Sequence, residues 1–176
     1  MTEAAEDPLL ARVLEVAASQ IGVLEQPPGS NRGPEVDQYL RTVGLDPTEG
    51  SFPWCAAFVY WCFAQAVEAL NRENPVIRTA QVLDHWRKAG ERGVRRLLSD
   101  EAVDNLALVK PGQIFVIATG AGNGHTGLVE RTSGGKLVTI EGNTNVGGSR
   151  EGIGVFRRES RKTVDINRGF IDYAGA

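Results

Sequence analysis

Residue types that often identify a protein's chemistry are scarce in this chain. Its 176 residues include two cysteines and two histidines. A zinc site needs four ligands at characteristic spacing, which these residues do not offer. No Asp-rich loop supplies the alternating oxygen ligands that calcium requires. The sequence therefore predicts neither a metal site nor another cofactor.

Excess positive charge and long apolar runs are also lacking. The net charge is −3 and the pI is near 5.5, which gives no reason to expect a nucleic-acid partner. No run of about 18 apolar residues occurs, so membrane insertion is not expected. The first segment, MTEAAEDPLLARVLEVAASQ, is acidic where a secretory signal needs positive charge. We expect action in the cytosol, export by a route that reads no such signal, or one module of a longer protein.

The residues that are present predict one globular domain over residues 1–176. Apolar residues make up 41% of the chain and charged residues 23%, and this length can bury a core. Apolar residues recur at helical spacing in the first half, and short β-branched segments with Gly, Ser and Asn turns fill the second. We expect helices over 9–21, 34–44, 53–70 and 79–90, and strands over 112–119, 125–132, 135–142, 154–160 and 168–174.

Helices followed by strands predict an α+β domain. The segment from Pro53 to about Leu70 is apolar almost all round, so this helix should be central and packed on one sheet face. The strands are expected to form an antiparallel meander of about five, with TSGGK as one hairpin connection.

The central helix holds both cysteines, in FPWCAAFVYWCFAQA. Cys55 and Cys62 would lie roughly 10 Å apart on a helix that rises about 1.5 Å per residue, too far for a disulfide. A thiolate is stabilised at a helix N-terminus by unpaired N–H groups and the positive dipole end. Cys55 is therefore the candidate nucleophile, with a small buried residue as the alternative, and Cys62 is expected in the core.

A cysteine nucleophile needs a histidine as base and acid. His85 lies among charged helix residues and is interpreted as structural. His125, in GAGNGHTGLVE, begins a strand, and Gly124 and Gly127 are expected to leave room for a substrate around its ring.

The imidazole in turn needs a polar group that holds its orientation. Glu141 and Asn143, in LVTIEGNTN, are two residues apart and would share one face of an extended strand. Either could accept a hydrogen bond from His125. The alternative is an ordinary turn with an exposed glutamate.

The motifs PWCAAFVYWC, GHTGLVE and TIEGNTN, preceded by GVLEQPPGSNRGPEVDQYL, resemble the CHAP family of cysteine- and histidine-dependent amidohydrolases and peptidases. The resemblance covers roughly Val16 to Tyr173 and implies a papain-like core. It implies Cys55 as the nucleophile, His125 as general base and acid, and Glu141 as the orienting residue, with Asn143 assisting. Family members that bind calcium carry an Asp-rich stretch that this chain lacks.

The resemblance also implies cleavage of an amide in bacterial peptidoglycan, through a thioester acyl-enzyme. The bond is either that between muramic acid and L-alanine or one within the peptide stem or cross-bridge. The Cys55 N–H would hold part of the oxyanion, with Asn31 or an N–H of residues 51–52 as candidate second donors. Trp54 and Tyr60 are candidates to line the cleft, with core packing as the alternative.

Two other functions stay open: a non-catalytic wall-binding module, and a cysteine protease or amidase with a substrate outside the wall. The expected place of action is the cell wall or periplasm. The chain could be a toxin, a phage lysin or a module of a larger protein. If it is a toxin, an immunity protein or a secretion apparatus is an expected partner.

Overall fold

The four longer helices of the described chain lie between Pro8 and Glu91, where the apolar spacing predicts helices. The computed structural model describes residues 7–144 and 152–176. Asp7 caps the first helix by accepting hydrogen bonds from the N–H groups of Leu9 and Leu10. The helices are α1 (Pro8–Ser19), α2 (Pro34–Thr42), α3 (Cys55–Ala69), α4 (Val82–Glu91) and the short α5 (Ser99–Asp104). None of the described helices has the length and apolar character to cross a bilayer.

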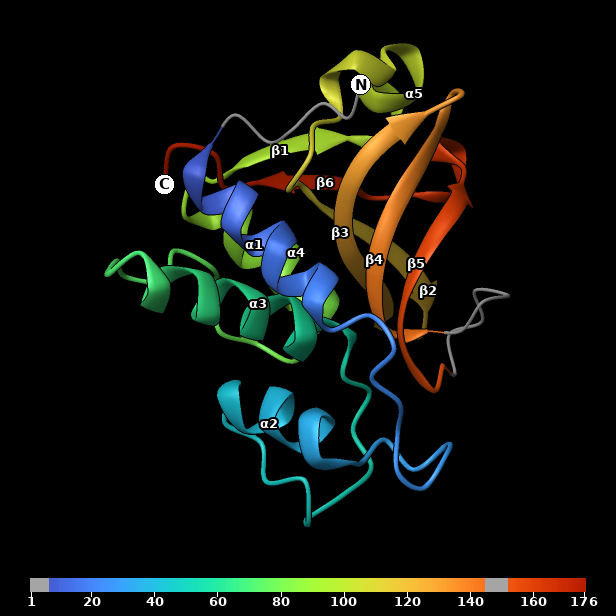
Figure 1. Cartoon of the computed structure of the whole chain (residues 1–176). Helices are drawn as coiled ribbons and strands as arrows, with labels where there is room; N and C mark the ends of the chain where they lie inside the picture. The colour runs from blue at the N-terminus through green and yellow to red at the C-terminus, as the bar shows by residue number, and fades with distance from the viewer. Residues whose placement is uncertain (1–6, 145–151) are drawn as a thin grey trace.

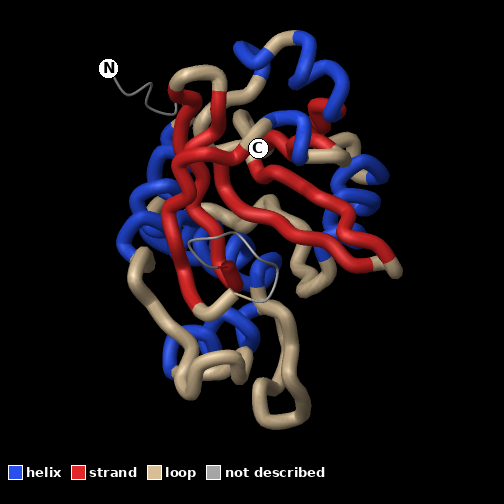
Figure 2. Tube along the Cα trace, turned by 90° about the vertical axis from the view of Figure 1, so that its right-hand side faces the viewer, coloured by secondary structure: helices blue, strands red, loops and turns tan. Residues whose placement is uncertain are grey.

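The strands form one antiparallel sheet in the order β1-β6-β2-β3-β4-β5. Its members are β1 (Arg95–Leu98), β2 (Ile114–Gly120), β3 (Asn123–Ser133), β4 (Lys136–Thr144), β5 (Gly154–Arg161) and β6 (Gly169–Asp172). Figure 1 shows α1, α3 and α4 beside the sheet, and Figure 2 shows the strands from the side. The α+β class and the helix-on-sheet packing are confirmed.

The expected meander is correct for β2 to β5 and wrong for the last strand. β6 does not follow β5 but pairs with β2 on one side and β1 on the other. Phe170 and Ile171 explain the placement, because both are fully buried and belong to different core clusters. A strand that buries both faces is better placed between two neighbours than at an edge. Within the described residues the sheet has six strands rather than about five, because β1, which the sequence analysis did not predict, joins the expected strands.

The sheet separates two clusters of buried side chains. Leu128 and Ile140 belong to the larger cluster, which includes most of the buried face of α3. Val129, one residue after Leu128, and Leu137, three residues before Ile140, belong to the smaller cluster on the opposite face. Helix α3 also contacts α1 and α2, so it is buried on several sides, as its apolar composition predicts.

Candidate active site

Cys55 is the first residue of α3, preceded by Trp54 at the N-cap. The helix begins two residues later than the expected start at Pro53. Cys55 therefore lies nearer to the unpaired N–H groups of the first turn than predicted. Its side chain is 5% exposed and lines a pocket of about 780 Å³. The sulfur is thus neither sealed in the core nor freely exposed.

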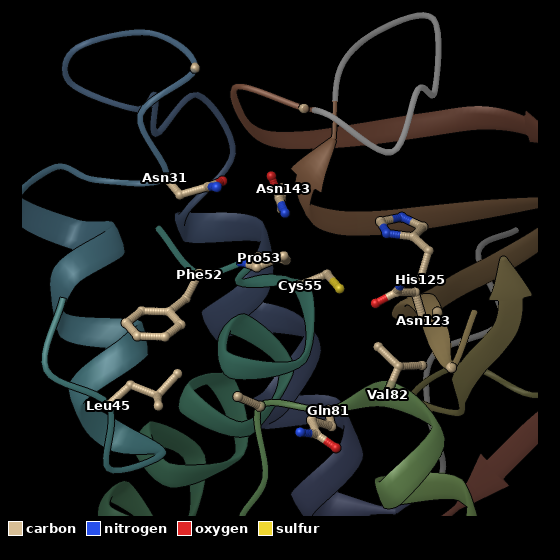
Figure 3. A pocket seen from close by; sticks show the side chains of 15 residues that line it. Asn31, Leu45, Phe52, Pro53, Cys55, Gln81, Val82, Asn123, His125 and Asn143 are labelled. Atoms are coloured by element: carbon tan, nitrogen blue, oxygen red, sulfur yellow. The ribbon is translucent and has the colours of Figure 1, made fainter. Parts of the chain in front are cut away.

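His125 lies opposite Cys55 across this pocket (Figure 3). It comes from β3, where its alternation with Val129 places it on the sheet face of the smaller cluster. Its ring is 5.8 Å from that of Phe115. The two side chains that the sequence identifies as nucleophile and base are therefore brought together by different halves of the chain.

Glu141, from β4, lies behind the imidazole. His125 Nε2 donates to its Oε2 at 2.7 Å. Oε1 of the carboxylate accepts from the Thr139 hydroxyl at 2.6 Å, and the guanidinium of Arg161 donates to both oxygens, each at 2.7 Å. With Nε2 committed to Glu141, Nδ1 is the ring nitrogen available to Cys55.

The charges of this group reinforce one another. Burial lowers the pKa of His125, but hydrogen bonds to Cys55 and Glu141 outweigh it and raise this pKa to about 9. Burial raises the pKa of Glu141, but hydrogen bonds from His125 and Arg161 outweigh that and lower it to about 2. At neutral pH the imidazole is therefore protonated and the carboxylate ionised. An imidazolium beside the sulfur stabilises a thiolate, the form that attacks carbonyl carbons.

Gly127 does not leave room for a substrate, as the sequence analysis predicts, but for neighbouring side chains of the protein. A Cβ atom there would lie 2.8 Å from the Phe115 ring and 2.9 Å from Cγ of Glu141, below normal contact distance. Its missing side chain makes room for Glu141 to reach His125, not for a substrate. Gly124 does line the pocket, but a Cβ there would meet Val82 and a carbonyl of β2.

Asn143 and Asn31 both point into the pocket near Cys55 (Figure 3). Each has a positive φ, 54° and 55° respectively, which is uncommon outside glycine. Asn31 Nδ2 donates to the Ser51 hydroxyl at 2.9 Å. Within the described part of the chain, Oδ1 of Asn143 has no hydrogen-bond partner, so of the two candidate orienting residues Glu141 is the one that accepts a hydrogen bond from His125. The expected contact between Asn143 and the imidazole is thus not made.

The two aromatic candidates for the cleft are not in it. The indole of Trp54 is fully buried, and its Nε1 donates to Oε1 of Glu25 at 2.8 Å. A Cβ at Gly142 would lie 2.8 Å from that indole, so Trp54 packs against β4. Tyr60 is half-buried against the larger core cluster and does not line the pocket. It lies five residues after Cys55, which turns it away from the pocket-facing side of α3.

Several residues of the pocket, and the buried Arg161 behind it, could not be predicted from the sequence, because their residue types do not indicate catalysis as a cysteine or a histidine does. The loop before α3 supplies Phe52, and the start of α4 supplies Gln81 and Val82. Arg161 is recognisable only once β5 is seen beside β4. The described lining consists of Gly29, Asn31, Leu45, Phe52, Pro53, Cys55, Ala80, Gln81, Val82, Gly122, Asn123, Gly124, His125, Asn143 and Gly152.

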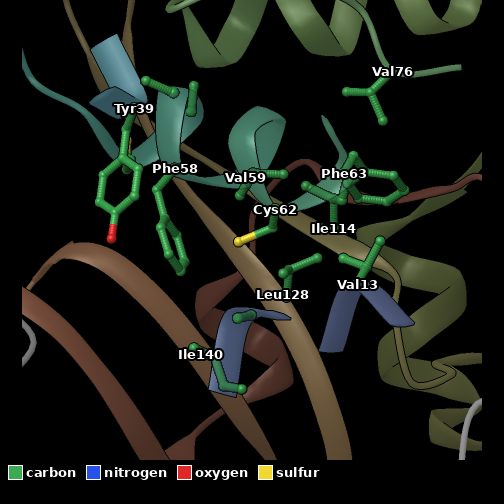
Figure 4. Close-up of a cluster of buried hydrophobic side chains, with 14 of the residues drawn as sticks. Val13, Tyr39, Phe58, Val59, Cys62, Phe63, Val76, Ile114, Leu128 and Ile140 are labelled. Atoms are coloured by element: carbon green, nitrogen blue, oxygen red, sulfur yellow. The ribbon is translucent and has the colours of Figure 1, made fainter. Parts of the chain in front are cut away.

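Cys62, by contrast, is completely buried among apolar side chains of the larger cluster (Figure 4). Burial raises the pKa of its thiol, which keeps it neutral. Both cysteines are free thiols. Over residues 7–144 and 152–176, no group of three or more His, Cys, Asp or Glu side chains is arranged to hold a metal ion.

Comparison with known proteins identifies a family for this chain. The family model of the CHAP domain matches residues 47–143, more than half of the chain and a range that includes Cys55, His125 and Glu141. No curated protein and no solved structure gives a significant match.

Proposed function

The chain belongs to the CHAP domain family, and we propose from this premise that it hydrolyses an amide bond of bacterial peptidoglycan with Cys55 as the nucleophile. CHAP domains are cysteine- and histidine-dependent amidohydrolases or peptidases. The observation that supports the proposal best is the sulfur of Cys55 at a helix start, opposite a His125 imidazole that donates to a buried Glu141.

The chemistry is an acyl transfer in two steps. The Cys55 thiolate attacks the amide carbonyl, His125 gives its proton to the departing amine, and a thioester remains. His125, now neutral, removes a proton from water, whose oxygen attacks the thioester. The acid product leaves, and the thiolate and the protonated imidazole return. The backbone N–H of Cys55 is one donor for the oxyanion, and the amide of Asn143 or Asn31 is our candidate for the other.

The lining of the pocket favours one of the two classes of bond. Apart from Cys55 and His125, every lining residue within the described ranges is uncharged. A bond flanked by free carboxylates or amines would be expected to have charged partners near it. The amide between muramic acid and L-alanine is flanked by a lactyl group and a methyl group, both neutral. We therefore favour amidase activity over cleavage within the peptide stem.

Digestion of purified peptidoglycan and of casein, with products identified by mass spectrometry, tests this function. We expect new muramic acid carboxylates and free L-alanine amino termini, and no cleavage of casein. Cys55→Ala should lower the rate by at least about 10³-fold, the scale typical for loss of a nucleophile. Cys62→Ala, the matched control, should keep most of the activity, since Cys62 is outside the pocket.

Each other product pattern rejects part of the proposal. New amino termini inside the peptide stem would reject the amidase assignment. Cleavage of casein alone would reject peptidoglycan as the substrate. Equal loss of activity in both cysteine variants, with unchanged circular dichroism, would remove Cys55 from its role.

A further inference from the structure

Arg161, at the end of β5, carries a charge into the interior of the protein. Its side chain is 9% exposed, and its guanidinium carbon lies 4.9 Å from the centroid of the Phe115 ring. Arginine is seldom buried unless it is paired. The partner is Glu141, which receives Nε on one oxygen and Nη2 on the other. Such a two-point contact fixes the plane of a carboxylate as well as its position.

Glu141 itself has no contact with solvent. Its two oxygens accept four hydrogen bonds, two from Arg161 and one each from His125 and Thr139. A carboxylate offers about four acceptor sites, so its capacity is filled. Removing the two bonds from Arg161 would leave half of that capacity without a donor in a buried place.

The charges around Glu141 alternate in sign. In the thiolate form that the proposed reaction uses, the charges of Cys55, protonated His125, Glu141 and Arg161 sum to zero, whereas the same group without Arg161 carries a net negative charge. A buried uncompensated charge is costly, and a carboxyl in that setting tends to take up a proton. Among the described residues, Arg158 also faces Glu141, but its nearest guanidinium nitrogen is 3.9 Å away. Burial and repulsion from Arg161 also lower the pKa of Arg158.

We propose that Arg161 is a positioning residue that keeps Glu141 ionised and turned toward His125 at acidic pH. It acts through Glu141 and touches neither the substrate nor the sulfur. Its part in peptidoglycan hydrolysis rests on the proposed function, but its effect on the reactivity of Cys55 does not.

The test is therefore alkylation of Cys55 by iodoacetamide, which needs no substrate. The rate at pH 5 divided by the rate at pH 8 is measured by mass spectrometry for the wild type, Arg161→Met and Arg161→Lys. Arg157→Met is the matched control, because Arg157 makes an equally close two-point pair with Glu130 at the exposed side of the same strand.

We expect the ratio to fall at least about tenfold in Arg161→Met, because Glu141 without its two-point partner takes up a proton above pH 5 and no longer supports the imidazolium beside the sulfur. Lysine, which keeps the charge but not the two-point contact, should lose less. Added guanidinium at a non-denaturing concentration should restore part of the ratio in Arg161→Met, and Arg157→Met should match the wild type. A wild-type ratio in both Arg161 variants would overturn the proposal. If Arg161→Met does not fold by circular dichroism, Arg161→Lys alone decides between these outcomes.

Discussion

At the scale of single residues, Glu141 is a buried carboxylate whose charge acts on the catalytic candidate His125. The carboxylate raises the pKa of His125, and it does so while satisfied by a hydroxyl and a guanidinium on its other sides. A carboxylate paired only with the imidazole would be a poorer counter-ion, because burial alone favours its neutral form. Orientation and charge are therefore supplied together.

Glu141→Gln separates these two contributions, since it keeps the shape and removes the charge. The pKa of His125 should fall from about 9 toward its ordinary value of 6.5, as observed by NMR titration of the ring. The rate of hydrolysis should fall by less than in His125→Ala, which removes the proton donor itself. An unchanged rate would transfer the orienting role to Asn143, against the geometry described above.

At the scale of elements, the site depends on how closely the helix and the strands approach. Gly142 lets Trp54 and Phe58 of the α3 region contact β4 directly, because a Cβ there would lie within 2.8 Å of both side chains. Gly127 does the same for Glu141 and Phe115 inside the smaller cluster. Two glycines that look like ordinary turn or strand residues thus set the distances between the site's parts.

Gly127→Ala should therefore reduce activity more than it reduces stability. We expect a loss of about 1–3 kcal/mol of unfolding free energy, the usual range for overpacking. Hydrolysis should fall at least about tenfold, because the Cβ displaces the carboxylate from His125. Val129→Ala, two residues along the same strand face, is the control: it should cost similar stability in urea denaturation and leave the pKa of His125 in place. Normal activity in Gly127→Ala would contradict the prediction that hydrolysis depends on the position of Glu141 beside His125.

Sequence patterns predicted the elements better than their connections. The helix with Cys55, the strands with His125 and Glu141, and the turn at Gly134-Gly135 follow from local periodicity and turn chemistry. The position of β6 does not, because it depends on which partner buries both of its faces. β1 has four residues, including two arginines, and so gives no clear strand pattern.

The same limit applies to the site. Cysteine and histidine can be predicted as catalytic candidates because few other residue types have their chemistry. Arg161 cannot be told from the other arginines by sequence, because its contact with Glu141 depends on the fold. Trp54 is a candidate for the cleft by sequence, with core packing as the alternative, and the partner that decides for the core, Glu25, is far away in sequence. Long-range pairs of this kind leave no mark on local spacing.

At the scale of the whole molecule, the proposed substrate determines where the protein is harmful. Expression with an added export signal should lyse a bacterial host, because peptidoglycan lies outside the inner membrane. Expression without that signal should be tolerated. Cys55→Ala with the same signal is the control and should not lyse cells. Toxicity of the form without a signal would count against a wall substrate.

Stability of the whole fold should depend on pH through two buried histidines with opposite shifts. His85 donates to or accepts from the Tyr173 hydroxyl at 2.9 Å, and burial lowers its pKa to about 4. The unfolded chain therefore binds more protons than the native one between about pH 4 and 6.5, so stability rises with pH across this window. The pKa of His125 is raised to about 9, so the stability it contributes is complete below about pH 6.5 and is lost between 6.5 and 9.

The two effects together place the maximum of the unfolding free energy near pH 6.5. The shift at His85 corresponds to about 3 kcal/mol of lost stability at pH 4, and Glu141 adds to the loss only below about pH 4.5. Urea denaturation from pH 4 to 9 should trace this maximum. In His85→Gln the unfolding free energy should depend less on pH below the maximum, and in His125→Gln it should depend less on pH above the maximum. A wild-type curve that falls steadily in one direction would contradict the assignment, since it would mean that one of the two rings titrates at its ordinary value in the folded protein.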